Sequence, residues 1–145
     1  MMVVGALDGV TTAGLFALTN AGAANTGSAM FIAGTGDGRV FARRLAALDV
    51  NVARSSVAQP FVLLATLTTA GASAYFCSRT PTTSAVASAT FSQATAVLGA
   101  VDSSNTFAML NCSMAAMTLW NRALTTAEIS FALRSAGAYY GVPIS

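Results

Sequence analysis

Apolar residues from position 1 to position 120 occur in short runs. These runs are separated by clusters of Gly, Asn, Asp and Ser. Within the runs, apolar residues tend to alternate with small or polar ones, and most of the chain lacks the spacing of a helix. Short runs of this kind between turn-forming residues are typical of β-strands in an all-β array. The pattern predicts strands at 1–7, 14–19, 29–33, 39–45, 50–54, 61–67, 73–77, 86–91, 96–101, 107–110 and 114–120.

Turn-forming residues predict two hairpins within this array. The pair Asp37-Gly38 ends a glycine-rich stretch and precedes an alternating run at 39–45, which is a strong hairpin signal. A phosphate-binding loop would need a lysine and a following helix, so we interpret residues 34–38 as a β-turn. The second predicted hairpin joins 61–67 to 73–77, and a turn-rich loop follows at 80–84.

The segment after residue 123 departs from the strand pattern. Thr125 is a predicted N-cap, and Glu128 three residues later completes a capping box. Arg134 falls in the last turn, where the helix dipole favours a cation, and Gly137 supplies the stop. One face of this helix carries the apolar residues Ile129, Ala132, Leu133 and Ala136. We therefore predict a helix at 126–136, followed by a final strand or packed segment at 138–144.

The stretch from Met117 to Ile129, MTLWNRALTTAEI, resembles the closing motif of concanavalin A-like lectin and glucanase domains, in particular the laminin-G-like jelly rolls. In that family the last long strand ends in an aromatic residue. The sequence Asn-Arg-Ala-Leu follows, and then Thr or Ser and a helix that contains Glu-Ile. The hairpin at 61–77 and the segments at 96–99 and 105–107 are similar to the family in outline. The resemblance implies an antiparallel jelly-roll β-sandwich with one short C-terminal helix, formed as a single domain by residues 1–145.

The residues of this motif are expected to serve the fold. A large aromatic residue at the end of a core strand buries much apolar area, and a ligand role for Trp120 is the alternative. Arg122 can reach back to carbonyl groups or to an acid, and Glu128 closes the helix cap. We expect the helix to cover one edge or end of the sandwich, where it guards an exposed strand. The structural set comprises Trp120, Arg122, Leu124, Glu128 and Ile129.

The acidic residues argue against catalysis. Glucanases of this fold carry two glutamates and an aspartate on one strand, and glycoside hydrolysis needs paired carboxylates at a fixed separation. This chain has a single glutamate and four aspartates that lie far apart in sequence, at Asp8, Asp37, Asp49 and Asp102. Calcium sites need several acidic oxygen ligands, and the chain has no histidine to activate a serine or to bind a metal. We expect no enzymatic activity, no cofactor and no metal.

Composition narrows the class of protein further. Of 145 residues, 54% are hydrophobic and 8% are charged, and seven arginines against five acids give a formal net charge of +2. This hydrophobicity excludes a disordered chain, and the few cations argue against a nucleic-acid partner. Polar residues interrupt the uncharged stretches, so we expect no membrane span, and no signal peptide is expected at the start. Because so little charge gives weak self-repulsion, we expect a homo-oligomer rather than a lone monomer.

Three groups of residues are candidates for contacts or chemistry. Arg39, Arg43 and Arg44 form the basic cluster, which is either a solvated edge or a contact for an acidic partner or a glycan carboxylate. The loop residues that suit a glycan are Asp37, Arg79 and Asn105. Cys77 and Cys112 are interpreted as two small buried hydrophobes, although they can pair if the fold brings their Cα atoms within about 7 Å.

Two functions are compatible with this sequence. The first is a structural protein of a virus particle, such as a bacteriophage capsid decoration (cement) protein or a tail or fibre component. Such a protein would assemble through apolar β-sandwich surfaces with its own copies and with partners such as the major capsid protein, in the virion and, during assembly, in the host cytoplasm. The alternative is a lectin-like module that recognises a host cell-surface glycan.

Overall fold

The computed structural model describes residues 1–7, 13–19, 27–32, 38–43, 49–52, 60–68, 71–84, 95–98 and 112–145. Within these ranges the chain forms ten β-strands and a C-terminal helix, so the predicted all-β class with one helix is confirmed. The elements are β1 (Met2–Leu7), β2 (Ala13–Thr19), β3 (Gly27–Ile32), β4 (Gly38–Arg43), β5 (Asp49–Val52), β6 (Pro60–Thr68), β7 (Gly71–Phe76), β8 (Thr82–Ser84), β9 (Thr95–Leu98), β10 (Cys112–Thr118) and α1 (Thr126–Tyr140).

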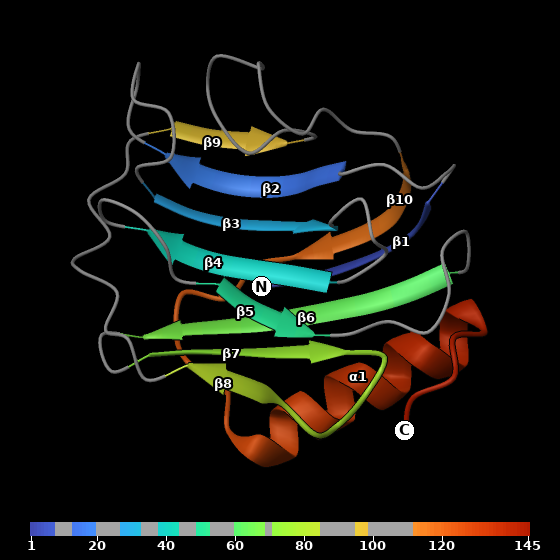
Figure 1. Cartoon of the computed structure of the whole chain (residues 1–145). Coiled ribbons are helices and arrows are strands. Elements are labelled where there is room, and N and C mark those ends of the chain that lie inside the picture. Colours follow the sequence, from blue (N-terminus) through green and yellow to red (C-terminus); the bar gives the residue numbers. More distant parts are fainter. Residues whose placement is uncertain are drawn as a thin grey trace.

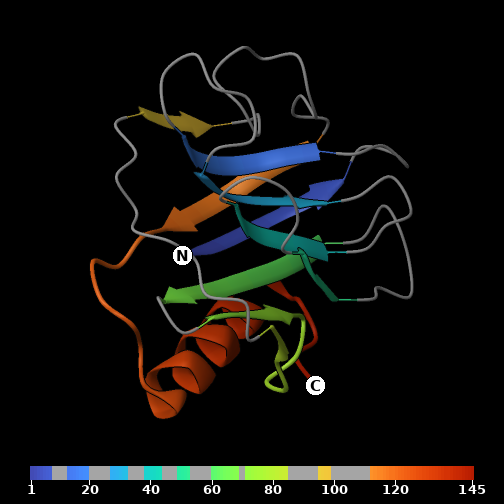
Figure 2. The ribbon, with the colours of Figure 1, turned by 60° about the vertical axis from the view of Figure 1, so that its left-hand side comes forward.

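The strands pair into two five-stranded antiparallel sheets (Figure 1). One sheet has the order β10-β1-β6-β7-β8 and the other the order β5-β4-β3-β2-β9. The chain therefore leaves the first sheet after β1, returns at β6, and crosses twice more to place β9 and β10. Cα atoms of β4 and β5 lie within 8 Å of those of β7, which is where the two sheets approach each other (Figure 2).

Both predicted hairpins are confirmed, whereas the predicted loop at 80–84 is wrong in part. Strand β3 pairs with β4, and β6 pairs with β7, in continuous antiparallel register. Residues 82–84 form the short strand β8, which pairs with β7. Pro81 lies just before this strand, at a position where a missing N–H costs no ladder hydrogen bond. The strands predicted at 86–91 and 107–110 lie outside the described residues.

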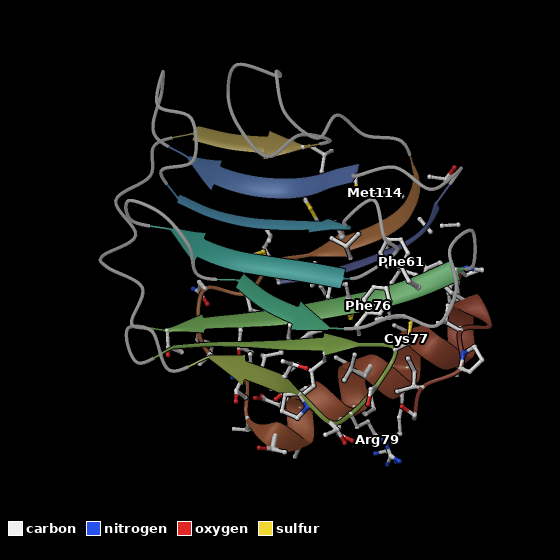
Figure 3. The ribbon with its side chains drawn as sticks, in the orientation of Figure 1. Phe61, Phe76, Cys77, Arg79 and Met114 are labelled. Carbon is white, nitrogen blue, oxygen red and sulfur yellow. The ribbon has the colours of Figure 1, made fainter. Side chains whose placement is uncertain are left out.

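Strand β6 is buried on both faces. Every residue from Phe61 to Ala65 is at most 1% exposed, which requires a cover on each side of the sheet. On one face, Val62 and Leu64 pack with residues of β1, β7 and α1 in a single apolar cluster. On the other face, the rings of Phe61 and Phe76 lie side by side with centroids 5.7 Å apart (Figure 3). Burial of both faces explains why this run lacks the polar alternation of a half-exposed strand.

Helix α1 covers a face of the sheet, and the expectation that it covers an edge or end is wrong. Its buried residues Ile129, Leu133 and Ala136 contact side chains of the central strands. The contacted residues on the sheet are Val4, Val62, Leu64 and Tyr75. The reason is the size of the apolar surface, because the outward face of β1, β6 and β7 is as hydrophobic as the inward face and must be removed from water.

The helix is longer than predicted. It continues to Tyr140 and ends at Gly141, whose φ of 68° is the left-handed cap that glycine adopts readily. Gly137 therefore lies inside the helix, and Arg134 is not in its last turn. The chain then folds back, with the Val142 N–H donating to the Gly137 carbonyl at 2.8 Å and Val142 buried. Residues 141–144 are thus the packed segment of the two predicted alternatives.

Candidate functional site

The start of α1 carries a reciprocal hydrogen-bond network. The Glu128 N–H donates to the Thr125 hydroxyl at 3.3 Å, and the Thr125 N–H donates to Glu128 Oε2 at 2.8 Å. These two bonds form the predicted capping box and satisfy N–H groups that the first turn leaves without helical partners. The sequence prediction of this cap is confirmed.

Arg122 adds a two-pronged ion pair to the same carboxylate. Its Nη2 lies 2.6 Å from Glu128 Oε1 and its Nη1 lies 2.9 Å from Oε2, while Nη1 also donates to the Ala123 carbonyl at 3.2 Å. The hydrogen bonds from Arg122 and Thr125 lower the pKa of Glu128 from 4.5 to about 2. Trp120 and Leu124 on either side are half-buried against the cluster beneath the helix. The connection from β10 to α1 is therefore fixed by both polar and apolar contacts.

Acidification is expected to weaken this connection. A carboxylate whose pKa is lower in the folded state stabilises the fold above its ordinary pKa of 4.5, and that contribution is lost as the pH falls towards about 2. We expect the difference in melting temperature between the wild type and Glu128→Gln to shrink across this pH range, measured by circular dichroism. Contributions from ionisable groups that the two proteins share cancel in the comparison. A difference that stays constant with pH would contradict the role of the charged pair.

Arg79, which is labelled in Figure 3, lies beside the C-terminal residue Ser145. Its backbone N–H donates to the Ser145 carbonyl at 2.7 Å, and its Nε donates to the same oxygen at 3.4 Å. The Ser145 N–H donates in turn to the Cys77 carbonyl at 3.1 Å. Arg79 was predicted as a glycan contact together with Asp37 and Asn105, which both lie outside the described residues. Its observed contacts hold the C-terminal segment against the end of β7.

The basic cluster is described only in part. Arg39 and Arg43 lie in β4, where the Cα atom of Arg39 is opposite that of Asn51 in β5 and that of Arg43 is opposite Gly27 in β3. Arg44 lies outside the described residues. At Arg39, β4 pairs with β3 on one side and with β5 on the other, so the expected edge position is wrong for this residue, whereas solvation of the cluster stays a prediction. A contact of these arginines with an acidic partner stays a prediction.

The strand order also decides whether Cys77 and Cys112 can form a disulfide with each other. Cys112 begins β10 and Cys77 follows β7, with β1 and β6 between them. Since neighbouring strands lie about 4.8 Å apart, the two backbones are roughly 14 Å apart. A disulfide needs Cα atoms within about 7 Å, so these two residues do not pair within one chain. Cys77 is half-buried, and its sulfur accepts from the Val62 N–H at 3.5 Å.

Large hydrophobic side chains are exposed on the outer face of α1. Phe131 is 68% exposed and Tyr139 is 82% exposed, and Ser135 lies exposed between them at four-residue spacing. The sequence prediction missed this stripe because it followed only the apolar face of Ile129 and Leu133. The signal was present, since residues 131, 135 and 139 fall on the opposite side of a helix with 3.6 residues per turn. Leu119, just after β10, is a further exposed residue at 51%.

A shallow hollow of about 390 Å³ lies where the C-terminal half of α1 meets the returning tail. Arg134, Ala138, Gly141 and Pro143 are among the residues that line it. The adjacent rings of Tyr139 and Tyr140 meet edge to face, with centroids 4.8 Å apart. Neither tyrosine is among the residues that line the hollow, where the exposed Arg134 supplies the charged group.

The described residues contain no group of three or more His, Cys, Asp or Glu side chains that could hold a metal ion. In the same part of the chain, no helix is long and apolar enough to cross a membrane. Comparison of the chain with models of known families, with curated proteins and with solved structures gives no match. Among the described residues, the exposed large hydrophobic side chains lie on α1 (Phe131, Tyr139 and Tyr140), in or just after β10 (Met117 and Leu119) and on β9 (Leu98).

Proposed function

We propose that this protein is a non-enzymatic structural component of a virus particle, a bacteriophage capsid decoration protein or a tail or fibre component. The observation that carries the proposal is the exposure of Phe131, Tyr139 and Leu119 on a chain with 8% charged residues. Exposed apolar side chains with little charge around them mark a surface that neighbouring molecules cover. A structural protein that works inside a larger assembly has such neighbours at all times.

We further infer that the two sheets form a concanavalin A-like jelly roll. The alternation of the chain between the sheets supports this, because β1, β6 and β10 meet in one sheet from distant parts of the sequence. The capping box and the Arg122–Glu128 pair support it as well, since they occupy the positions of the closing motif. Folds of this kind occur in virions and in glycan-binding proteins, so the fold is compatible with both candidate functions.

Light scattering after size-exclusion chromatography tests the assembly that this function requires. We expect the mass of the purified protein, measured by light scattering, to be at least twice the 14.6 kDa of one chain. A mass of 14.6 kDa at every concentration would contradict assembly through apolar surfaces. The viral role is tested separately, by asking whether neighbouring genes encode capsid, terminase or tail proteins and whether mass spectrometry finds this chain in purified particles. Its absence from such particles would contradict the viral role.

A lectin-like module is the second candidate, and the hollow at the C-terminal end of α1 favours it. Arg134 lines the hollow and supplies hydrogen-bond donors there. Tyr139, one residue after the lining residue Ala138, presents an exposed ring that a sugar can stack on. A glycan array with the purified protein tests this candidate. We expect any specific binding to be lost in Tyr139→Ala, and an array without hits would contradict the lectin function.

A further inference from the structure

The hollow beside the C-terminal half of α1 has one wall from the helix and one from the returning tail. Val142, Pro143 and Ile144 line it from the tail, and all three are apolar. Ile144 can lie against the helix because Gly137 has no side chain, since a Cβ there would be 2.5 Å from Ile144 Cγ1. Apart from its chain neighbours, Gly141 has no heavy atom within 4 Å of where a Cβ would stand, so the helix end borders open space. A small molecule in the hollow would therefore contact an apolar wall and the helix together.

Arg134 provides hydrogen-bond donors at this hollow. Its side chain is exposed, and its Nε donates to the Ser130 carbonyl at 3.4 Å. Within the described part of the chain, neither of its two NH2 groups has a hydrogen-bond partner. Glu128, the single acid of α1, is already bound through both oxygens to Arg122. The two NH2 groups of Arg134 are thus available to a carboxylate, which a guanidinium binds with two parallel N–H donors.

The last turn of α1 provides acceptors at the same hollow. The N–H groups of Gly141 and Val142 both donate to the Gly137 carbonyl. The carbonyl groups of residues 138–140 therefore accept no hydrogen bond from the described residues. Ala138, which carries one of these carbonyls, lines the hollow. Open carbonyls at a helix end are satisfied by water or by a ligand, and a hydroxyl group is a suitable donor to them.

We propose that this hollow binds an acidic sugar, a hexuronic or sialic acid residue of a glycan. The proposal rests on the lectin-like function, for which it names the class of ligand. The carboxylate accepts two hydrogen bonds from Arg134, and hydroxyl groups of the sugar ring donate to the open carbonyls of the last turn. The C–H groups of the ring lie against the apolar residues 142–144. An acidic peptide fits less well, because an ionised Asp or Glu side chain carries no donor for these carbonyls.

The electrostatics of the helix fix the direction in which such a sugar lies. The C-terminal end of a helix carries partial negative charge, which repels a carboxylate and attracts hydroxyl hydrogens. Arg134 lies one turn before Ala138, about 6 Å along the axis, and its positive charge compensates this repulsion. The carboxylate therefore lies at Arg134 and the hydroxyl groups at the helix end. A neutral sugar would lack the charge-assisted hydrogen bonds, which are roughly twice as strong as neutral ones.

Paired glycans test this inference on the intact protein. The array carries acidic glycans, each beside its carboxyl-reduced counterpart, in which a CH2OH group replaces the carboxylate. Hexaglutamate on the same array represents an acidic peptide. We expect the wild type to bind acidic glycans and to bind their reduced counterparts and hexaglutamate much more weakly.

Two variants of α1 then test the role of Arg134, by titration calorimetry with the acidic glycan that binds best. We expect Arg134→Gln to bind it about 10- to 100-fold more weakly, the usual effect of losing hydrogen bonds between charged groups. Thr126→Glu is the matched control, because it lowers the net charge by the same amount at an exposed position about 12 Å away along the helix axis. Screening by salt should keep its affinity within about twofold of the wild type. Circular dichroism establishes that each variant is folded.

The outcomes separate the inference from the function on which it rests. An array without any hit refutes both the lectin function and the acidic ligand. Equal binding of acidic and reduced glycans refutes the acidic ligand and leaves the lectin function standing, and equal binding of hexaglutamate refutes the sugar. Unchanged affinity in Arg134→Gln, or an equal loss in Thr126→Glu, overturns the assignment to this hollow. If Arg134→Gln fails to fold, NMR titration of the wild type decides, because amide shifts centred on residues 134–144 support the inference and shifts elsewhere overturn it.

Discussion

Replacement of Leu133 by alanine is expected to lower the free energy of unfolding by about 3–5 kcal/mol. Leu133 is fully buried between α1 and the sheet, in the same cluster as Val62, Leu64 and Tyr75. Alanine is the best helix former, so the substitution leaves the helix itself unharmed. The loss comes from the transfer of apolar atoms and from the cavity that rigid neighbours on β6 and β7 cannot fill.

Chemical denaturation of the wild type and Leu133→Ala measures this loss, with Phe131→Ala as the matched control. Phe131 lies two residues away on the same helix but is 68% exposed, so its truncation is expected to change stability by no more than about 0.5 kcal/mol. Equal effects of the two substitutions would show that α1 is not docked on the sheet through this face. A large effect confined to Leu133 would support the position of the helix.

The start of α1 could be predicted from sequence because its determinants are local. Thr125 and Glu128 are three residues apart, and the bonds between them form wherever the first turn forms. The ion pair from Arg122 spans only six residues, and the sequence indicated carbonyl groups or an acid as the partners of this side chain. Local hydrogen bonds of this kind need no knowledge of the rest of the fold.

The position of the helix could not be predicted by the same means, although one signal was present. The run from Phe61 to Ala65 is continuously apolar, which indicates a strand with both faces covered. The helix was instead expected at an edge or end of the sandwich, because it would guard an exposed strand there. The pairing of β8 with β7 was missed for a related reason, since the partner that makes 82–84 a strand lies in another run.

The exposed surface was the least predictable part of the candidate site. Phe131, Met117 and Leu119 are apolar residues in apolar surroundings, and the sequence alone does not separate covered from uncovered ones. Only the strand order reveals that β10 is an edge among the described strands. The three glycan candidates and the arginine cluster were chosen from turn and charge signals in the sequence. Of these six residues, the structure describes Arg39, Arg43 and Arg79.

Replacement of Gly137 by alanine is expected to lower the free energy of unfolding by about 1–3 kcal/mol, the usual cost of forcing extra atoms into a packed core. Helix propensity alone predicts the opposite, because alanine is favoured over glycine by about 1 kcal/mol inside a helix. A Cβ at residue 137 would lie 2.5 Å from Cγ1 of Ile144 and 2.7 Å from the carbonyl oxygen of Val142. The returning tail therefore occupies the space that any side chain would need.

Chemical denaturation of Gly137→Ala measures the sign of the effect, and Ser135→Ala is the control at an exposed position of the same helix. Ser135→Ala is expected to be neutral or slightly stabilising, because alanine is the better helix former. Ile144→Ala in the Gly137→Ala background should recover part of the loss, since it removes the side chain in the clash but leaves the Val142 carbonyl in place. Stabilisation by Gly137→Ala would mean that residues 142–144 do not pack on the helix. In that case the packing of the tail would not explain why a glycine stands at position 137 inside the helix. Destabilisation by Gly137→Ala, with partial rescue by Ile144→Ala, would show that the absence of a side chain at Gly137 lets the tail pack against α1.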